Sequence, residues 1–232
     1  TGDSTASDVV ARAKSYGVSL TEYLISVYFY ALQEIQERTE RKRRRSRRKP
    51  IAVMVPVNLR RILPSSTMRN FFLNLNPLLD TRLDRYEFEE ITAKVHYFLR
   101  TQLDHRHLKQ QISRNVKGAM HPLIRFAPLF VKDIALKSIY RDYGESRYSG
   151  SISNLGRVRV PEAVEEKVEK IRFIPPPSPV LGVKCGVVSL GETISMSFGG
   201  LIEETALERL FFGFLRKEGI EVRLEGNWKG EY

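Results

Sequence analysis

The sequence predicts an α/β (mixed α+β) fold in which a mixed β-sheet is flanked by helices. Helix-like and strand-like segments follow one another irregularly, which favours one mixed sheet covered by helices over strict strand–helix alternation. The 232 residues are 42% hydrophobic and 28% charged, which excludes disordered and fibrous classes. The single cysteine, Cys185, excludes a disulfide scaffold and fits a reducing cytosol, so we expect a cytoplasmic protein.

The first elements are two helices. Residues 8–16 predict a short helix that ends at Gly17, and Ser19 to Glu22 form a capping box that opens a longer helix. Apolar residues recur at helical spacing in this second helix, and its middle is apolar all round, so it should be buried on most sides. The residues with that spacing are Leu20, Leu24, Val27, Ala31 and Ile35.

Strands and helices then follow in mixed order. The apolar run 51–55 predicts an interior strand, and alternation predicts a second strand at 71–77. Helical patterns cover 85–117 and 123–140. Further strands are predicted at 150–156, 170–174, 180–190 and 193–198, with Gly191 and Glu192 as a hairpin turn, and a helix at 203–217 and a strand at 220–224 complete the fold.

The positive charge is concentrated in one run. The net charge is +11, and eight of the basic residues lie within 41–49; without them the net charge is +3. Such a run binds nucleic acid, anionic lipid or phosphate groups, or is a solvated loop between ordered elements. We expect a basic surface loop at 41–49. Because no aromatic residues are interleaved in it, the run does not predict a stacking platform for single strands, and we do not expect a nucleic-acid partner.

No complete catalytic constellation is visible. The sequence has no phosphate-binding loop, dinucleotide-binding glycine motif or nucleophile elbow. His105 and His107 are two residues apart, which places them on different helix faces, so no metal site is expected. His96 is expected to pack or cap within its own helix. Cys185 lies in an apolar strand and is expected in the core. We therefore assign no catalytic residue and no metal ligand.

Two segments carry more polar groups than a core needs. The first joins the strands at 51–55 and 71–77, where buried backbone requires polar side chains or a ligand. Its side chains either staple this connection or contact a ligand, and the candidates are Asn58, Arg60, Arg69 and Asn70.

The second polar segment is the strand at 150–156. Small hydroxyls alternate with isoleucine and end in Asn and Gly, which is typical of a strand that another backbone or a ligand approaches closely. Its candidates are Ser151, Ser153, Asn154 and Gly156.

Taken in order, these features resemble the C-terminal half of the chloramphenicol-acetyltransferase-like superfamily, which includes condensation domains and alcohol acetyltransferases. Three features carry the resemblance: the apolar helix after Ser19, the Pro-Val-Asn-Leu-Arg…Met-Arg-Asn-Phe-Phe strand pair, and the Ser-Asn-Leu-Gly strand. The likeness covers about Ser4 to Asn227 and is nearest to bacterial alcohol-acetyltransferase-like members.

The resemblance implies a two-lobed acyltransferase with a substrate tunnel between the lobes. In the family, a His-His-x-x-x-Asp-Gly motif of the first lobe supplies the general base. This sequence has no such motif, so residues 1–232 are expected to be a C-terminal lobe that is inactive alone. The start at Thr1 likewise suggests a longer parent protein. Ser151, Ser153, Asn154 and Gly156 would line the tunnel or the lobe interface, with Asn58, Arg60, Arg69 and Asn70 as its support.

The resemblance also implies the partners. The expected ones are the N-terminal lobe of the same protein and a small alcohol or amine acceptor, with acyl-CoA (acetyl-CoA) as co-substrate and no tightly bound cofactor. An isolated lobe would expose its interface or cover it by forming a homodimer. Two alternatives stay open: a nucleic-acid or anionic-surface binding module that uses 41–49, and a non-catalytic scaffold.

Overall fold

The structure, a computed structural model, describes residues 1–40, 48–63, 65–120, 122, 128–129, 131–133, 137, 147–161, 163, 167–201 and 204–226. The strands within these ranges are β1 (Gly2–Thr5), β2 (Ile51–Asn58), β3 (Phe72–Leu75), β4 (Leu78–Leu79), β5 (Gly150–Arg157), β6 (Val183–Leu190), β7 (Thr193–Gly200) and β8 (Arg223–Leu224). They form one sheet in the order β3-β2-β5-β6-β7-β1-β8, with β4 also paired to β2. The neighbours β2, β5 and β6 are parallel and the other pairs antiparallel, which confirms the predicted mixed sheet.

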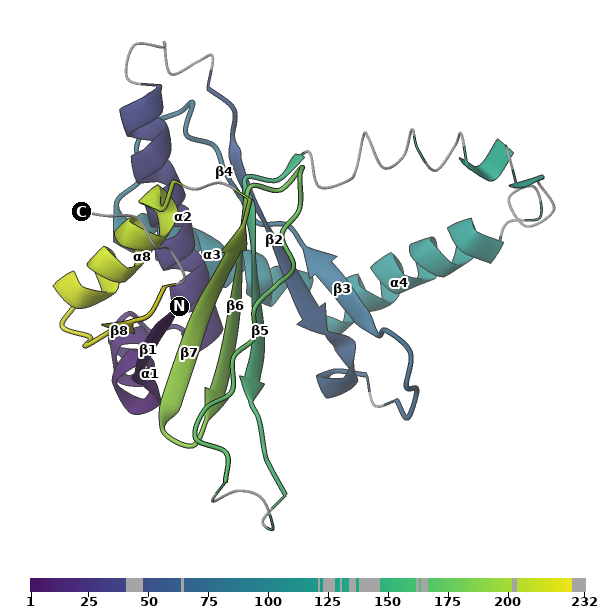
Figure 1. Ribbon diagram of the computed structural model, residues 1–232. Coiled ribbons are helices and arrows are strands. Elements are labelled where there is room, and N and C mark those ends of the chain that lie inside the picture. Colours follow the sequence, from purple (N-terminus) through teal and green to yellow (C-terminus); the bar gives the residue numbers. More distant parts are fainter. Residues whose placement is uncertain are drawn as a thin grey trace.

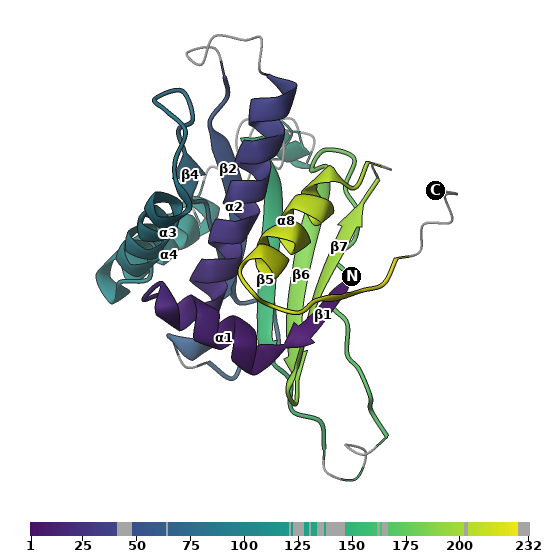
Figure 2. The same ribbon diagram turned by 90° about the vertical axis from the view of Figure 1, so that its left-hand side faces the viewer.

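Helices flank this sheet, as predicted. In the described ranges they are α1 (Ala6–Ser15), α2 (Leu20–Thr39), the short 3-10 helix η2 (Leu59–Arg61), α3 (Phe88–Gln102), α4 (His105–Met120) and α8 (Ala206–Lys217). Figure 1 shows α4 projecting from the body, and Figure 2 shows α1, α2 and α8 in front of the sheet. Of the helices described, none combines the length and apolarity needed to cross a bilayer.

Helix α2 forms the centre of the core. Its predicted capping box is present: the Ser19 amide donates to Glu22 Oε2 (2.7 Å), and the Glu22 amide donates to Ser19 Oγ (3.3 Å). Tyr28 and Phe29 are almost completely buried, and the Tyr28 ring stacks on Phe198 of β7. The all-round apolar middle of α2 is therefore explained by burial on most sides, against the sheet and between α3 and α8.

The N-terminal strand was not predicted. Residues Gly2–Thr5 have no apolar alternation, but they form β1 because β7 and β8 both offer antiparallel partners. Gly2 fits a close contact, since a Cβ there would lie 2.3 Å from Cε1 of Phe212 on α8. The strand is thus specified by distant neighbours, not by its own residues.

The prediction of a strand at 170–174 is wrong. This segment has no ladder pairing and crosses the sheet instead: a Cβ on Gly186 would lie 2.2 Å from the carbonyl oxygen of Phe173, and one on Gly199 would lie 2.2 Å from that of Pro175. The two glycines leave room for the crossing backbone. The apolar–basic alternation of 170–174 therefore reflects packing across strands and ion pairing, not pairing at an edge.

The helical pattern over 85–117 is two helices, α3 and α4. The break falls at Leu103–Asp104, where the Asp104 carboxylate accepts hydrogen bonds from the amides of Arg106 (2.9 Å) and His107 (3.4 Å). An aspartate in this position signals the start of a helix. The amphipathic pattern continues across it, so the pattern alone suggests one long helix. Most of the helix predicted at 123–140 lies outside the described residues.

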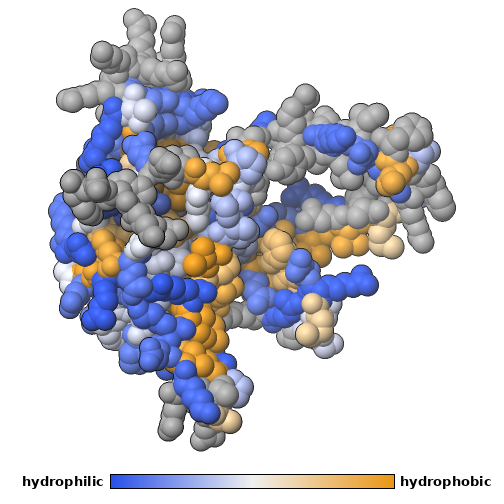
Figure 3. Space-filling view, viewed as in Figure 1, coloured by the Kyte–Doolittle hydropathy of each residue, from blue (hydrophilic) through white to orange (hydrophobic). Residues whose placement is uncertain are grey.

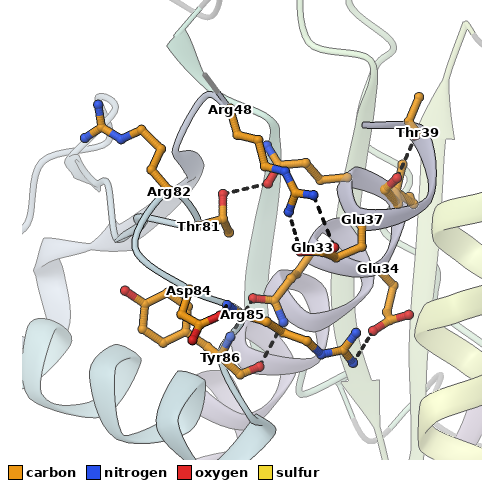
Figure 4. A network of polar contacts seen from close by, with 12 residues as sticks. Gln33, Glu34, Glu37, Thr39, Arg48, Thr81, Arg82, Asp84, Arg85 and Tyr86 are labelled. Atoms are coloured by element: carbon orange, nitrogen blue, oxygen red, sulfur yellow. Dashed lines mark hydrogen bonds and ion pairs between the residues drawn. The ribbon is translucent and has the colours of Figure 1, made fainter. Parts of the chain in front are cut away.

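A polar network joins α2 to the segment before α3 (Figure 4). The side chain of Gln33, completely buried, donates to the carbonyl of Tyr86 (2.9 Å) and accepts from its amide (3.0 Å). In the predicted basic loop, 41–47 lie outside the described residues. Arg48 is not a surface residue: it is 5% exposed and pairs with Glu37 through both carboxylate oxygens, because a buried guanidinium requires a counter-charge.

A second network holds the two chain ends together. Lys170 Nζ lies 2.8 Å from Asp3 Oδ2 and 2.9 Å from Glu225 Oε1, and Ser195 Oγ donates to Asp3 Oδ1 (2.7 Å). Burial alone would raise the pKa of Asp3, but the hydrogen bonds from Lys170 and Ser195 outweigh it and lower the pKa. Hydrogen bonds from Lys170 and Arg172 lower the pKa of Glu225 to about 2.

These pKa shifts predict acid lability. A carboxyl whose pKa is lower in the folded than in the unfolded state stabilises the fold at pH values above its unfolded-state pKa. This stabilisation is lost as the pH falls through the folded-state pKa. We expect Asp3→Asn to lower the Tm at pH 7, and the difference from the parent chain to shrink as the pH falls from about 4 towards 2. Thermal unfolding followed by circular dichroism checks this; a difference that is constant with pH would contradict it.

Candidate functional site

A pocket of about 480 Å³ lies beside the N-terminus of α2, where β2 and β5 end. Because β2 and β5 are parallel neighbours, their carboxyl ends meet at one edge of the sheet, where ligands commonly bind in α/β proteins. Its volume is typical of small-molecule sites. The polar lining is Ser19, Thr21, Glu22, Asn58, Ser153 and Asn154, and the apolar lining is Val55, Pro56, Val57, Ile62, Phe72, Leu99, Leu103 and Leu155.

The predicted residues Ser153 and Asn154 both line this pocket. Asn154 Nδ2 donates to Thr21 Oγ1 in the first turn of α2 (2.9 Å), and its Oδ1 accepts from the Gly156 amide (2.8 Å). Gly156 has φ 79° at a bulge in the β5–β6 pairing, a conformation that glycine adopts readily. Asn154 therefore fixes the end of β5 against α2, and Ser153 beside it forms part of the pocket wall.

Ser151 lies deeper in β5 and does not line the pocket. Its side chain is 6% exposed, and it pairs with Met54 and Lys184 of the neighbouring strands. The close approach predicted for this strand occurs one residue earlier: a Cβ on Gly150 would lie 2.2 Å from the Tyr28 hydroxyl. The group that approaches the strand at Gly150 is thus a core tyrosine.

The polar connection after β2 was predicted either to hold the chain in place or to contact a ligand. Its residues differ in this respect. Asn58 lines the pocket, and its Oδ1 accepts from the Arg60 amide (3.0 Å), which caps η2. The Arg60 guanidinium donates to the carbonyls of Thr67 (2.9 Å) and Arg69, so it staples the connection. Arg69 and Asn70 are exposed and are not pocket residues.

The pair Glu22–His96 was missed by the sequence analysis. The sequence indicates only a capping role for Glu22, but this residue is 8% exposed and lines the pocket, and its Oε1 lies 3.2 Å from Nδ1 of His96. His96 therefore contacts α2 and does not pack only within α3. The sequence does contain one signal for His96, which is its helical spacing from two leucines. His96, Leu99 and Leu103 fall on one helix face, and the two leucines line the pocket.

The described pocket residues combine apolar walls with a few polar groups. Such a lining, apolar with a few hydrogen-bonding residues such as Ser153 and Asn58, is typical of small-molecule sites. Cys185 is completely buried, and burial raises the pKa of its thiol, which confirms its place in the core. In the described parts of the chain, no three His, Cys, Asp or Glu side chains are grouped so as to hold a metal ion.

Comparisons with known proteins found similar chains among solved structures alone. No protein-family model and no curated protein matches the sequence. Among solved structures, the nonribosomal peptide synthetase FmoA3 superposes with a TM-score of 0.54 at 17% identity, over 94% of this chain and 21% of that chain. A condensation domain that mediates chain release from the enacyloxin polyketide synthase gives 0.49 at 16%, over 94% and 40%. The wax ester synthase/diacylglycerol acyltransferase of Marinobacter aquaeolei VT8 gives 0.47 at 13%, over 94% and 48%.

The chain thus shares its fold, a mixed sheet with flanking helices, with the part of FmoA3 on which it superposes. This chain spans half or less of the length of each of the three proteins.

Proposed function

From this shared fold, we propose that the chain is the C-terminal lobe of an O- or N-acyltransferase that transfers an acyl group from acyl-CoA to a small alcohol or amine. The observation that carries the proposal is the pocket itself. It joins Asn58, Ser153 and Asn154, three residues from two distant sequence motifs, at the carboxyl ends of parallel strands.

In this proposal each polar group either binds a substrate or holds the pocket in shape. The Ser153 hydroxyl and the Asn58 amide hydrogen-bond to the carbonyl of the thioester or to the acceptor, while the apolar walls hold the acyl chain. Asn154 is a positioning residue, because its hydrogen bond to Thr21 fixes β5 against α2. Arg60 supports the wall by tying the segment 67–69 to η2.

The general base is proposed to come from an N-terminal lobe. Acyl transfer requires a group that removes the proton of the acceptor hydroxyl or amine, and an accessible histidine is the usual one. A His-His-x-x-x-Asp-Gly motif in that lobe would supply it. Acetyl-CoA is the proposed donor, and the chain alone is expected to give no turnover.

The first test is the coding sequence upstream of Thr1. We expect a His-His-x-x-x-Asp-Gly motif about 150–200 residues upstream, the size of one further domain. A reading frame without that motif would overturn the enzymatic proposal and favour a scaffold or binding protein.

The second test is turnover by the complete protein. Release of CoA from acetyl-CoA in the presence of short alcohols or amines should fall about tenfold or more in Ser153→Trp, because the indole fills the pocket. Ser15→Trp, at an exposed position at the end of α1, is the matched control and should keep parental kcat/KM. Equal rates in both variants would show that the pocket takes no part.

A further inference from the structure

Helix α4 has an apolar stripe that leaves the protein body. Its members recur at every fourth residue: Leu108, Ile112, Val116 and Met120. Leu108 is completely buried and Ile112 packs against the core, but Val116 is 48% exposed and Met120 is 63% exposed. A stripe with four-residue spacing rotates about 40° around the helix at each step, which carries it from the core side to solvent.

The rest of the α4 surface is cationic. Arg106, Lys109, Arg114 and Lys117 are exposed, and the helix contains no aspartate or glutamate. Figure 3 shows the apolar surface over α4 next to hydrophilic surface, on the arm that projects in Figure 1. Two further apolar side chains, Leu129 and Val131, are 80% and 43% exposed in the described residues that follow.

We propose that α4 is a docking helix for an anionic lipid surface. An amphipathic helix with lysine and arginine beside an exposed apolar stripe lies in the headgroup region of a bilayer, with its apolar side chains inserted and its cations on the phosphates. The positive charge of α4 attracts anionic headgroups and would repel a basic protein. Because the helix projects, it reaches a bilayer while Leu108 anchors it to the body.

The probe is flotation of the chain with vesicles of phosphatidylcholine alone and of phosphatidylcholine mixed with phosphatidylglycerol. We expect binding to the anionic vesicles only, weakened by salt because the cations are exposed. The double variant Val116→Ser/Met120→Ser should bind about tenfold or more weakly, since serine removes the inserted apolar groups. Leu83→Ser, at a 76% exposed position in a turn outside α4, is its matched control and should bind like the parent chain.

Two double lysine variants isolate the electrostatic contribution to vesicle binding. Lys109→Gln/Lys117→Gln should weaken binding about tenfold or more, whereas Lys14→Gln/Lys217→Gln, exposed on α1 and α8, should change it little. Three results would overturn the proposal. One is no binding to anionic vesicles. Another is binding that survives Val116→Ser/Met120→Ser, which would assign it to the basic run at 41–49. The last is self-association in light scattering that this double variant abolishes, which would make the stripe a protein interface.

Discussion

Replacing Gln33 by leucine is expected to destabilise the protein by about 2–4 kcal/mol. The side-chain amide of Gln33 satisfies both the N–H and the C=O of Tyr86, at 3.0 and 2.9 Å, from a completely buried position (Figure 4). Leucine has nearly the same volume and keeps the packing, so the cost isolates the two backbone groups that lose their partner. Urea unfolding followed by circular dichroism measures the change in free energy.

The matched control for this variant is Gln110→Leu. Gln110 is exposed on α4, so the same chemical change should alter the free energy of unfolding by no more than about 0.5 kcal/mol. If Gln33→Leu were as stable as the parent chain, the segment before α3 would be held by its other contacts, such as Arg85 to Glu34, and the Gln33 bridge would be dispensable.

Adding one methyl group at Gly150 is expected to cost about 2–4 kcal/mol. The new Cβ of Gly150→Ala would lie 2.2 Å from the hydroxyl oxygen of Tyr28, whose ring is completely buried and cannot move aside freely. Relief of this clash shifts the ring and breaks the hydrogen bond from the Tyr28 hydroxyl to the Val183 carbonyl (2.9 Å). The cost therefore combines overpacking with a lost hydrogen bond.

The opposite sign is expected for Gly213→Ala. Gly213 lies in α8 with nothing within 4 Å of the new Cβ, so alanine should stabilise the helix by about 0.5–1 kcal/mol. Thermal unfolding of both variants compares the two glycines in one protein. A neutral Gly150→Ala would show that Tyr28 adapts, and that β5 and α2 are packed less tightly than the distances indicate.

The elements predicted correctly are those whose signal is local. The capping box at Ser19 and Glu22 fixes the start of α2, and the apolar run of β2 marks an interior strand. The same holds for the hairpin between β6 and β7, where Gly191 has φ 56°. Each of these signals acts within a few residues, so it is readable before the fold is known.

The errors at β1 and at 170–174 share one cause, which is long-range packing. Strand β1 exists because β7 and β8 flank it, and the segment 170–174 crosses the sheet because Gly186 and Gly199 leave space. The same distinction between local signals and long-range packing separates the site residues that were predicted from those that were not. Ser153, Asn154 and Asn58 were found because they lie in polar motifs, whereas Glu22 and His96 meet only through the packing of α2 on α3.

The most direct measurement of the central claim is the change in backbone amide chemical shifts when a thioether analogue of acetyl-CoA, which cannot be cleaved, is added to the chain. We predict saturable shifts at the residues around the pocket: Thr21, Asn58, Ser153, Asn154 and Leu155. The same titration of Ser153→Trp should leave these amides unshifted. Shifts confined to other surfaces, or none at saturating ligand, would contradict an acyl-binding role for this pocket.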